Sequence, residues 1–462
     1  MIRKIKWKNH KVLGNLELDF TKNDGSVYNT IVLAGENGSG KTTVLESISK
    51  YLTLEVSPNV EYWEYETVTG KFRISPLDGE ENLCFHRRIN LETNAVETIR
   101  RDRANNPDAL KMDKSDIRAY GCLYSKSRSG FNTRPVKSTT TEKLDSSKYD
   151  SDSNEDFTSI KQLIVDVHTQ DTYDYFQKNS NGESISMSDF QKNSKMYRFK
   201  KAFHHFFYGA MKFSKIDRAR NEMQILFEKY GKSITIDGLS TGEKQIIFRG
   251  SMLLKNSNVM ENGCILIDEP ELSMHPSWQS KILDYYRDLF RDTSNKQSAQ
   301  MIFATHSEYV IRSAIEEPND IVVVVLKNNG TDIETNKIVA PQVLPTITAA
   351  EINYIAFNIA SSDYHILLYG YLQEKTGCTS IKNCDNYIIQ QPEYDSNKHE
   401  KTYTYRCTTY KALPTYIRNC IDHPDRQHHF TNDELVTSIE LLQTLCKAVE
   451  THENLPEQLE EV

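Results

Sequence analysis

The stretch from Thr30 to Glu46, TIVLAGENGSGKTTVLE, constrains the fold more than any other part of the chain. An apolar run leads into a glycine-rich loop that matches G-x-x-x-x-G-K-[ST], and helical spacing follows. In this pattern a buried strand delivers a loop whose N–H groups surround phosphates at a helix N-terminus. It predicts an ATP-binding α/β core in which Lys41 neutralises phosphate charge and Thr42 ligates Mg²⁺. The predicted nucleotide contacts of the loop are Glu36, Asn37, Gly38, Ser39, Gly40, Lys41, Thr42 and Thr43.

Composition indicates the number of domains and the cellular compartment of such a protein. The chain has 462 residues, 38 % apolar and 26 % charged, which suffices for two or three domains. No apolar run is long enough to cross a bilayer, the basic N-terminus lacks a signal core, and the eight cysteines form no C-x-x-C pair. These features predict a soluble, cytoplasmic protein without a membrane partner. The net charge of −8 argues against global attraction to nucleic acid, although it can hide a basic face.

Three further motifs follow the phosphate loop in a fixed order. Residues 239–245 read LSTGEKQ, residues 264–270 form an apolar strand that ends in two carboxylates, and residues 300–307 form a strand that ends in a histidine. Together these motifs resemble the signature, Walker B with D-loop, and switch histidine of ABC-type ATPases of the SMC/OLD-like branch. Thr241 and Glu243 depart from transporter signatures and favour this branch. The resemblance covers about residues 1–50 and 230–330.

The resemblance assigns roles to the carboxylates and the histidine. Asp268 helps to hold Mg²⁺, and Glu269 orients or deprotonates the attacking water. His306 donates a hydrogen bond to the γ-phosphate. These residues, with Thr42 as the second Mg²⁺ ligand, form the predicted catalytic and metal site.

The signature implies a second subunit. In the family that the chain resembles, this motif completes the nucleotide site of another copy across an ATP sandwich. Ser240, Gly242 and Glu243 are the corresponding residues here. The expected assembly is therefore a homo-oligomer, with at least a dimer and a higher ring as the alternative.

Two positions leave alternatives open. The opening at 8–20 is similar to that of these ATPases, in which a basic side chain approaches the nucleotide, and Lys11 is the candidate beside the alternative of a surface lysine. The family also carries a Mg²⁺-sensing glutamine in the loop after a buried strand. Residues 117–124 are the candidate for that strand here. The loop after it holds Ser125, Lys126, Ser127 and Arg128 but no glutamine, so the residue that replaces it stays open.

The predicted fold class is α/β: an ABC-type P-loop ATPase head, with a mixed sheet flanked by helices, an inserted mainly helical lobe and a helical C-terminal region. Residues 1–138 and 230–345 form the two parts of the head, with strand pairs expected at 2–20 and antiparallel strands at 62–97. Residues 139–229 form the insertion, with a polar linker at 139–155 and helical spacing at 157–178 and 190–228. Its aromatic stripe is read as core. Residues 346–462 form the C-terminal region.

The insertion concentrates positive charge, which predicts either a solvated face or a surface for an acidic partner, DNA or a DNA-mimicking phage protein. The basic residues are Lys195, Arg198, Lys200, Lys201, Lys212, Lys215, Arg218 and Arg220.

The C-terminal region holds an R-N-x-x-x-H sequence at Arg418 to His423, the pattern of HEPN ribonucleases. A structural role for both side chains at a helix end is the alternative. A zinc cluster from Cys378, Cys384, His399 and Cys407 is a further possibility, although its spacing fits no standard site. The acidic motifs of a Toprim nuclease are absent from the sequence.

This layout resembles the ATPases of bacterial anti-phage defence, most of all the AriA family of PARIS systems, with the PtuA family of Septu systems as competitor. The resemblance implies an ATP-hydrolysing scaffold and sensor that sequesters a separate Toprim-type or HNH-type nuclease and releases or activates it on a phage trigger. A DNA-repair or DNA-end-binding SMC-like ATPase and a self-contained HEPN-type ribonuclease toxin are the alternatives.

Overall fold

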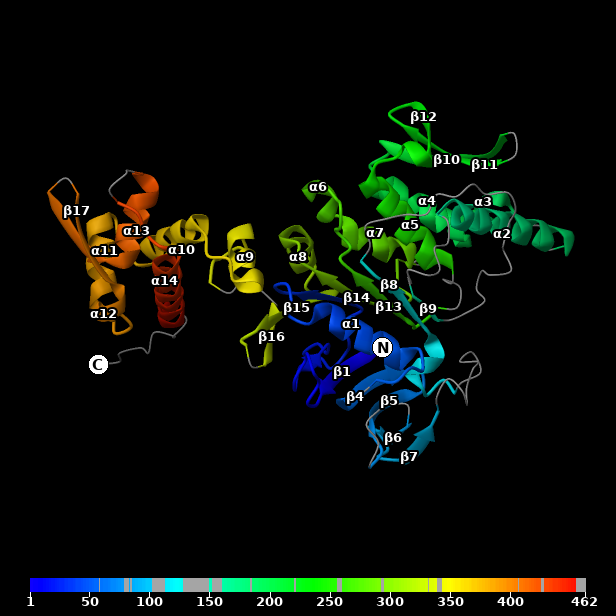
Figure 1. The fold of residues 1–462 in the computed structure, drawn as a ribbon, viewed down its shortest axis with the longest axis horizontal. Helices are drawn as coiled ribbons and strands as arrows, with labels where there is room; N and C mark the ends of the chain where they lie inside the picture. The colour runs from blue at the N-terminus through cyan, green and yellow to red at the C-terminus, as the bar shows by residue number, and fades with distance from the viewer. Residues whose placement is uncertain are drawn as a thin grey trace, which may run out of the picture. The chain divides into compact units, whose positions relative to one another are not determined.

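A computed structural model gives the architecture of the chain (Figure 1). It describes residues 1–57, 59–78, 83, 85–101, 113–127, 149–151, 160–182, 185–219, 222–255, 260–291, 295–330, 332–338, 343–405, 407–424 and 428–453. The fold divides into two compact units, 1–339 and 340–462. Within the described ranges no helix combines the length and apolar character that a membrane span requires.

A seven-stranded sheet in the first unit carries the predicted motifs. Its order is β16-β15-β3-β14-β13-β8-β9, and all neighbours are parallel except β15 and β16. The central strands are apolar and buried throughout, as expected for a parallel sheet covered on both faces. The strands are β3 (Thr30–Ala34), β8 (Cys122–Ser125), β9 (Tyr149–Ser151), β13 (Cys264–Asp268), β14 (Gln300–Thr305), β15 (Ile321–Asn328) and β16 (Ile333–Ile338).

The parallel register brings the motifs to one sheet edge. Ala304 pairs with Leu33 on one side and with Asp268 on the other, so β3, β13 and β14 end side by side. The phosphate loop, the carboxylate pair and His306 each follow directly after one of these strands. Ligands bind at this edge of open α/β sheets.

A second, antiparallel sheet packs against the phosphate-loop helix α1 (Lys41–Leu52). Trp7 Nε1 donates to Ser47 Oγ at 2.9 Å, and the rings of Tyr51 and Trp63 are 4.4 Å apart. The expected strand pair at 2–20 and the strands at 62–97 are confirmed. Their order is β2-β1-β4-β5-β6-β7, for β1 (Ile2–Trp7), β2 (Glu17–Asp19), β4 (Val60–Thr67), β5 (Gly70–Pro76), β6 (Phe85–Asn90) and β7 (Val96–Arg100).

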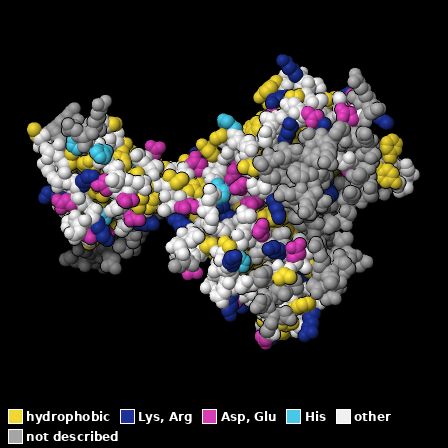
Figure 2. Space-filling view, viewed as in Figure 1, with side chains coloured by type: hydrophobic (Ala, Val, Ile, Leu, Met, Phe, Trp, Pro, Cys, Tyr) yellow, Lys and Arg dark blue, Asp and Glu magenta, His cyan; other side chains and the backbone are white. Residues whose placement is uncertain are grey.

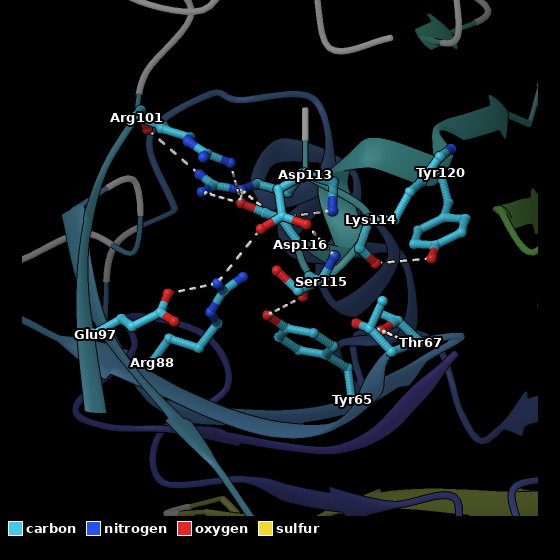
Figure 3. A network of polar contacts seen from close by, with 12 residues as sticks. Tyr65, Thr67, Arg88, Glu97, Arg101, Asp113, Lys114, Ser115, Asp116 and Tyr120 are labelled. Carbon is cyan, nitrogen blue, oxygen red and sulfur yellow. Dashed lines mark hydrogen bonds and ion pairs between the residues drawn. The ribbon is translucent and has the colours of Figure 1, made fainter. Parts of the chain in front are cut away.

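Beside this sheet the prediction of one strand at 117–124 is wrong in its first half. Ile117–Tyr120 is the 3-10 helix η2, and only Cys122–Ser125 is extended. The Asp116 carboxylate accepts the backbone N–H of Arg118 at 3.0 Å and its guanidinium at 2.8 Å, which bends the chain into a turn. Both side chains are fully buried within a polar network that also includes Arg88, Glu97 and Asp113 (Figure 3).

The inserted lobe is less helical than expected. Its helices are α2 (Ile160–Ser180), α3 (Met187–Asn193) and α4 (Lys195–Phe206), but residues 211–229 form the strands β10 (Met211–Ala219) and β11 (Glu222–Lys229), extended by β12 (Lys232–Thr235). The helical prediction over 211–228 is therefore wrong. Apolar side chains alternate at Met211 and Phe213 and again at Met223, Ile225 and Phe227, but a β-bulge between Phe213 and Lys215 shifts the register and obscures the period of two. The aromatic stripe is core, as predicted: Phe203 is fully buried and its ring lies 5.6 Å from that of Phe227.

The predicted polar linker lies mostly outside the described residues, at 139–148 and 152–155. Tyr149–Ser151 is not linker but the strand β9, which pairs with β8 at the edge of the seven-stranded sheet. Four helices complete the first unit: α5 (Thr241–Lys255), α6 (Pro276–Gln279), α7 (Ile282–Leu289) and α8 (Glu308–Ile315), preceded at α5 by the turn η4 (Ile236–Gly238).

The second unit is mostly helical, as predicted. It contains α9 (Ala349–Phe357), α10 (Ser362–Lys375), α11 (Ile381–Gln390), α12 (Ser396–His399), α13 (Leu413–Asp422), α14 (Asn432–Glu453) and a hairpin of β17 (Glu400–Tyr405) and β18 (Thr408–Ala412). Leu368, Ile417 and Leu442 lie in its core.

The structure describes the residues of both special motifs of this unit. Among the described residues no three His, Cys, Asp or Glu side chains come together as metal ligands, so the zinc hypothesis for 378–407 is wrong. Arg418 forms an ion pair with Asp422 at 2.5 Å one helical turn away and donates to Asn419 Oδ1 at 3.1 Å. His423 ends α13, and its N–H donates to the Asn419 carbonyl. This arrangement favours the structural interpretation of the R-N-x-x-x-H sequence.

Candidate nucleotide-binding site

The phosphate loop adopts a conformation that only glycine can supply at two positions. Gly35 has φ 144°, and a Cβ there would lie 2.3 Å from the Leu326 carbonyl oxygen. Gly40 has φ 91°, and a Cβ there would lie 2.7 Å from Leu13 Cδ2 and 2.9 Å from Ile333 Cδ1. The 10–14 loop therefore packs directly on the N-terminus of α1. Lys11 belongs to this loop and is exposed.

Lys41 is buried at the centre of the loop, with 4 % of its surface exposed. Its Nζ donates to the carbonyl oxygens of Gly35 and Glu36, both at 2.8 Å, and to Ser39 Oγ at 3.2 Å. Burial lowers the pKa of Lys41 to about 8, opposed by the nearby Asp268 carboxylate. Backbone carbonyls thus hold an ammonium whose charge they do not neutralise, and phosphate oxygens would do so.

The remaining residues of the phosphate loop differ in their exposure to solvent. Glu36, Asn37 and Gly38 are exposed, whereas Ser39 and Gly40 are buried beneath them. At the start of α1 the Thr42 side chain is exposed and Thr43 is half-buried. All of the predicted loop contacts therefore surround the N-terminus of a single helix, where orphan N–H groups favour anions.

Thr42 and Asp268 form a site of the kind that Mg²⁺ requires. Thr42 Oγ1 lies 3.0 Å from Asp268 Oδ2 and 3.3 Å from Oδ1. Burial raises the pKa of Asp268, while the hydrogen bond from Thr42 partly opposes the shift. Hard oxygen donors of this type, a hydroxyl and a buried carboxylate, fit Mg²⁺.

Glu269 and His306 face each other next to this pair. His306 Nε2 is 3.8 Å from Glu269 Oε1, which is too long for a hydrogen bond, and each side chain is one-third exposed. Burial and the charge of Lys41 lower the pKa of His306. Glu269 has φ 45°, a left-handed conformation that costs energy in a residue with a Cβ and is concentrated at functional sites.

Glu271 is a site residue that the sequence reasoning missed. Its Oε1 accepts from Thr305 Oγ1 and from the His306 N–H, both at 2.8 Å, so it fixes the backbone that carries the histidine. Burial raises the pKa of Glu271, and its Oε2 has no hydrogen-bond partner among the described residues. The sequence feature that could have identified Glu271 is its position two residues after Glu269.

Arg249 and Ser127 were also missed. Arg249 is fully buried in α5 and donates to the backbone oxygens of Asp268 at 2.8 Å and Lys126 at 3.3 Å. The Ser127 hydroxyl donates to Glu269 Oε2. A lone cation in the apolar run of α5, and a hydroxyl where a glutamine was expected, were the signals for these two residues.

The signature motif lies at the start of α5. Ser240 is exposed, and Gly242 packs so closely on the D-loop that a Cβ there would lie 2.7 Å from the Ser273 oxygen. The Glu243 carboxylate turns inward: it accepts from the Ser240 N–H at 2.8 Å and from Lys229 at 2.6 Å, and only 3 % of the residue is exposed. Within this chain Glu243 therefore caps its own helix.

One known protein family matches the part of the chain that contains this site. Residues 31–312 match the family described as "AAA domain, putative AbiEii toxin, Type IV TA system". The chain belongs to this AAA-domain family. Its match begins at the strand that enters the phosphate loop and ends in α8, so it includes Lys41, Asp268 and His306 but not Lys11.

Two similar proteins are retron ATPases. The chain is 24 % identical over 387 residues to the retron Vc95 probable ATPase of Vibrio cholerae serotype O1 biovar El Tor, covering 69 % of this chain and 74 % of that protein. It is 33 % identical over 107 residues to the retron Ec83 probable ATPase of Escherichia coli, covering 21 % of this chain and 19 % of that protein.

Solved structures of SMC heads are also similar. The Smc head bound to the C-winged helix domain of ScpA has a TM-score of 0.37 at 14 % identity, covering 73 % of this chain and 97 % of that one. The SMC head domain from Thermotoga maritima has a TM-score of 0.35 at 14 % identity, covering 73 % and 99 %. The α/β fold class predicted from the sequence is confirmed by the strand order and flanking helices described above.

Proposed function

We propose that this protein binds and hydrolyses ATP with Mg²⁺ and uses the nucleotide to control a bacterial defence complex. The observation that carries the proposal is the geometry at the start of α1, where backbone carbonyls hold Lys41 Nζ at 2.8 Å and Thr42 Oγ1 lies 3.0 Å from Asp268 Oδ2. A triphosphate fits this arrangement, because its oxygens would accept from the ammonium and its metal ion would bind the two oxygen ligands. The family membership and the retron ATPases support the same activity.

Each residue has a defined task in this reaction. Lys41 and the N–H groups at the start of α1 bind the phosphates, and Thr42 and Asp268 would hold the metal ion, which when bound neutralises charge on the phosphates. Glu269 orients the attacking water or accepts its proton. His306, held by Glu271 through its backbone, donates to the γ-phosphate. Lys11 remains a candidate for a further contact.

We further infer that the working unit is a homo-oligomer. The exposed Ser240 and Thr241 are available to a second copy, whose nucleotide they would complete, whereas the buried Gly242 positions them by packing on the Ser273 backbone. Glu243 supports this surface by capping the helix and does not itself point to the solvent.

The defence role is the finer part of the proposal. We place the protein among scaffold ATPases such as AriA of PARIS systems, with PtuA of Septu systems as competitor, which hold a separate Toprim-type or HNH-type nuclease and release or activate it on a phage trigger. The supporting comparisons are a family described by a toxin–antitoxin system and relatives from retrons.

The proposed acidic partner is DNA or a DNA-mimicking phage protein. The basic surface that the inserted lobe offers to it is smaller than the sequence suggested. Lys195 is buried and donates to the Lys255 oxygen, Lys212 pairs with Glu228 at 3.1 Å, and Lys215 pairs with Asp217 at 2.8 Å. On the described part of the face in Figure 2, Lys and Arg side chains are interspersed with Asp and Glu. Arg220 lies outside the described residues.

The experiment that tests the proposal is a mass measurement on Glu269→Gln with ATP and Mg²⁺. Loss of the carboxylate leaves binding intact and slows hydrolysis, so we expect an ATP-bound oligomer that persists, while Lys41→Ala stays in its nucleotide-free state. Co-expression with the neighbouring reading frame shows whether a nuclease joins this oligomer. Hydrolysis by Glu269→Gln at the wild-type rate would contradict the role of Glu269.

A further inference from the structure

We propose that Ser127 is the positioning residue for the Glu269 carboxylate, in the place where related ATPases carry a glutamine. The inference rests on the proposed ATPase activity and adds a residue that neither the family match nor the relatives assign. Its starting point is the hydrogen bond from Ser127 Oγ to Glu269 Oε2.

Strand register makes this contact a property of the fold. Strands β8 and β13 are parallel neighbours in which Ser125 lies opposite Ile267. Ser127 and Glu269 each lie two residues beyond this last pair, just after the two strands end. The pairing of two buried strands therefore brings the segments that carry the hydroxyl and the carboxylate to the same place on the sheet edge.

A buried guanidinium fixes the two backbones just before these residues. Arg249 donates through one nitrogen to the Asp268 oxygen at 2.8 Å and through another to the Lys126 oxygen at 3.3 Å. Asp268 precedes Glu269 and Lys126 precedes Ser127. Because Arg249 is fully buried, it holds both segments at a constant separation, which is what a positioning hydrogen bond needs.

The contact also orients the carboxylate. Ser127 engages Oε2, while Oε1 faces His306 at 3.8 Å. A serine hydroxyl donates one proton and leaves the second carboxylate oxygen available for water. Glu269 starts from a left-handed backbone, so its side-chain direction depends on such a partner.

The test is steady-state ATP hydrolysis by the full-length Ser127→Ala protein, with Ser125→Ala as the matched variant. Ser125 is the buried last residue of β8, two positions before Ser127, and its hydroxyl has no hydrogen-bond partner among the described residues. We expect Ser127→Ala to lower kcat about tenfold, the effect of one lost hydrogen bond, with KM for ATP unchanged. Ser127→Thr should restore kcat, and Ser125→Ala should leave it at the wild-type value.

A double variant separates positioning from a general effect on the strand. Because Ser127 acts through the carboxylate, Ser127→Ala should not lower the residual rate of Glu269→Gln any further. Wild-type kcat in Ser127→Ala, equal losses in both serine variants, or an additive loss in the double variant would each overturn the inference. Absence of hydrolysis by the wild-type protein would overturn the proposed ATPase function together with it, a different outcome from an unaffected Ser127→Ala.

Discussion

Two buried polar clusters in the first unit solve the problem of buried charge in opposite ways. In the network of Figure 3, Asp116 and Arg118 are fully buried and bonded to each other. Despite the opposing effect of burial, the charge of Arg118 lowers the pKa of Asp116 to about 2. Burial likewise opposes the rise in the pKa of Arg118, which Tyr51 and Asp116 cause. In the nucleotide-binding site, burial dominates: it raises the pKa of Asp268 and lowers that of Lys41.

The difference separates a structural cluster from a functional one. The buried ion pair of Asp116 and Arg118 stabilises its own charges, and Arg118 also lies over the Tyr51 ring of α1 and donates to the Arg101 oxygen next to β7. A cluster in which burial disfavours both a cation and the carboxylates close to it is poised for a ligand that supplies the missing charge. The first unit therefore contains one polar cluster that stabilises the fold by itself and one that a metal–phosphate ligand would complete.

Breaking the structural cluster should give the largest effect. Asp116→Asn leaves the Arg118 guanidinium buried without its counter-charge, so we expect a loss of ~3–5 kcal/mol in the free energy of unfolding. Asp113→Asn is the matched variant, because Asp113 is largely exposed and lies 3.9 Å from Arg88; it should cost less than ~1 kcal/mol. Chemical denaturation of both variants measures the difference. A loss of less than ~1 kcal/mol in Asp116→Asn would contradict the structural role of the Asp116–Arg118 pair.

Removing the cation of the functional cluster should act on binding and not on folding. Lys41→Ala loses its charge-assisted bonds to phosphate, and we expect at least ~100-fold weaker ATP binding with an unfolding free energy close to that of the wild type. Lys50→Ala, an exposed lysine at the other end of α1, should bind ATP normally. Calorimetric titration gives the affinities. Retained ATP binding in Lys41→Ala would show that the cluster is not a phosphate site.

Proton linkage gives a smaller and graded effect. Burial lowers the pKa of Lys41 to about 8 in the protein alone, and bound phosphate favours the ammonium, so its pKa is higher in the complex. Between these two values binding takes up a proton, and ATP affinity should fall up to about tenfold per pH unit as pH rises above 8. Titrations from pH 7 to 9.5 measure the slope. A constant affinity over this range would mean that Lys41 stays charged without phosphate.

The smallest effect should come from a surface pair that resembles neither cluster. Arg418 and Asp422 are partly exposed and one turn apart, so Arg418→Ala should cost ~0.5 kcal/mol of stability. If the motif is structural, the purified protein should leave RNA intact. RNA cleavage that His423→Ala abolishes in a folded protein would instead support the ribonuclease alternative.

The sequence was sufficient where a local pattern carries the function. The phosphate loop, Asp268, Glu269 and His306 each follow an apolar strand, and parallel strands must bring their ends to one edge. It was insufficient where a long-range contact decides the outcome. Ser127 can be recognised as a site residue only once the pairing of β8 with β13 is known. Glu243 turns inward because it forms an ion pair with Lys229, which lies on a strand that the sequence pattern did not predict.

The most direct test of the central claim is thermal unfolding of Asp268→Asn, with and without ATP and Mg²⁺. If the cluster around Asp268 awaits a ligand, removing its charge relieves burial, so the variant alone should unfold at the wild-type Tm or above it. Its Tm should then not rise when ATP and Mg²⁺ are added, whereas that of the wild type should. A variant that is destabilised as strongly as Asp116→Asn, and is still stabilised by ATP and Mg²⁺, would show that Asp268 is a structural residue and contradict the account.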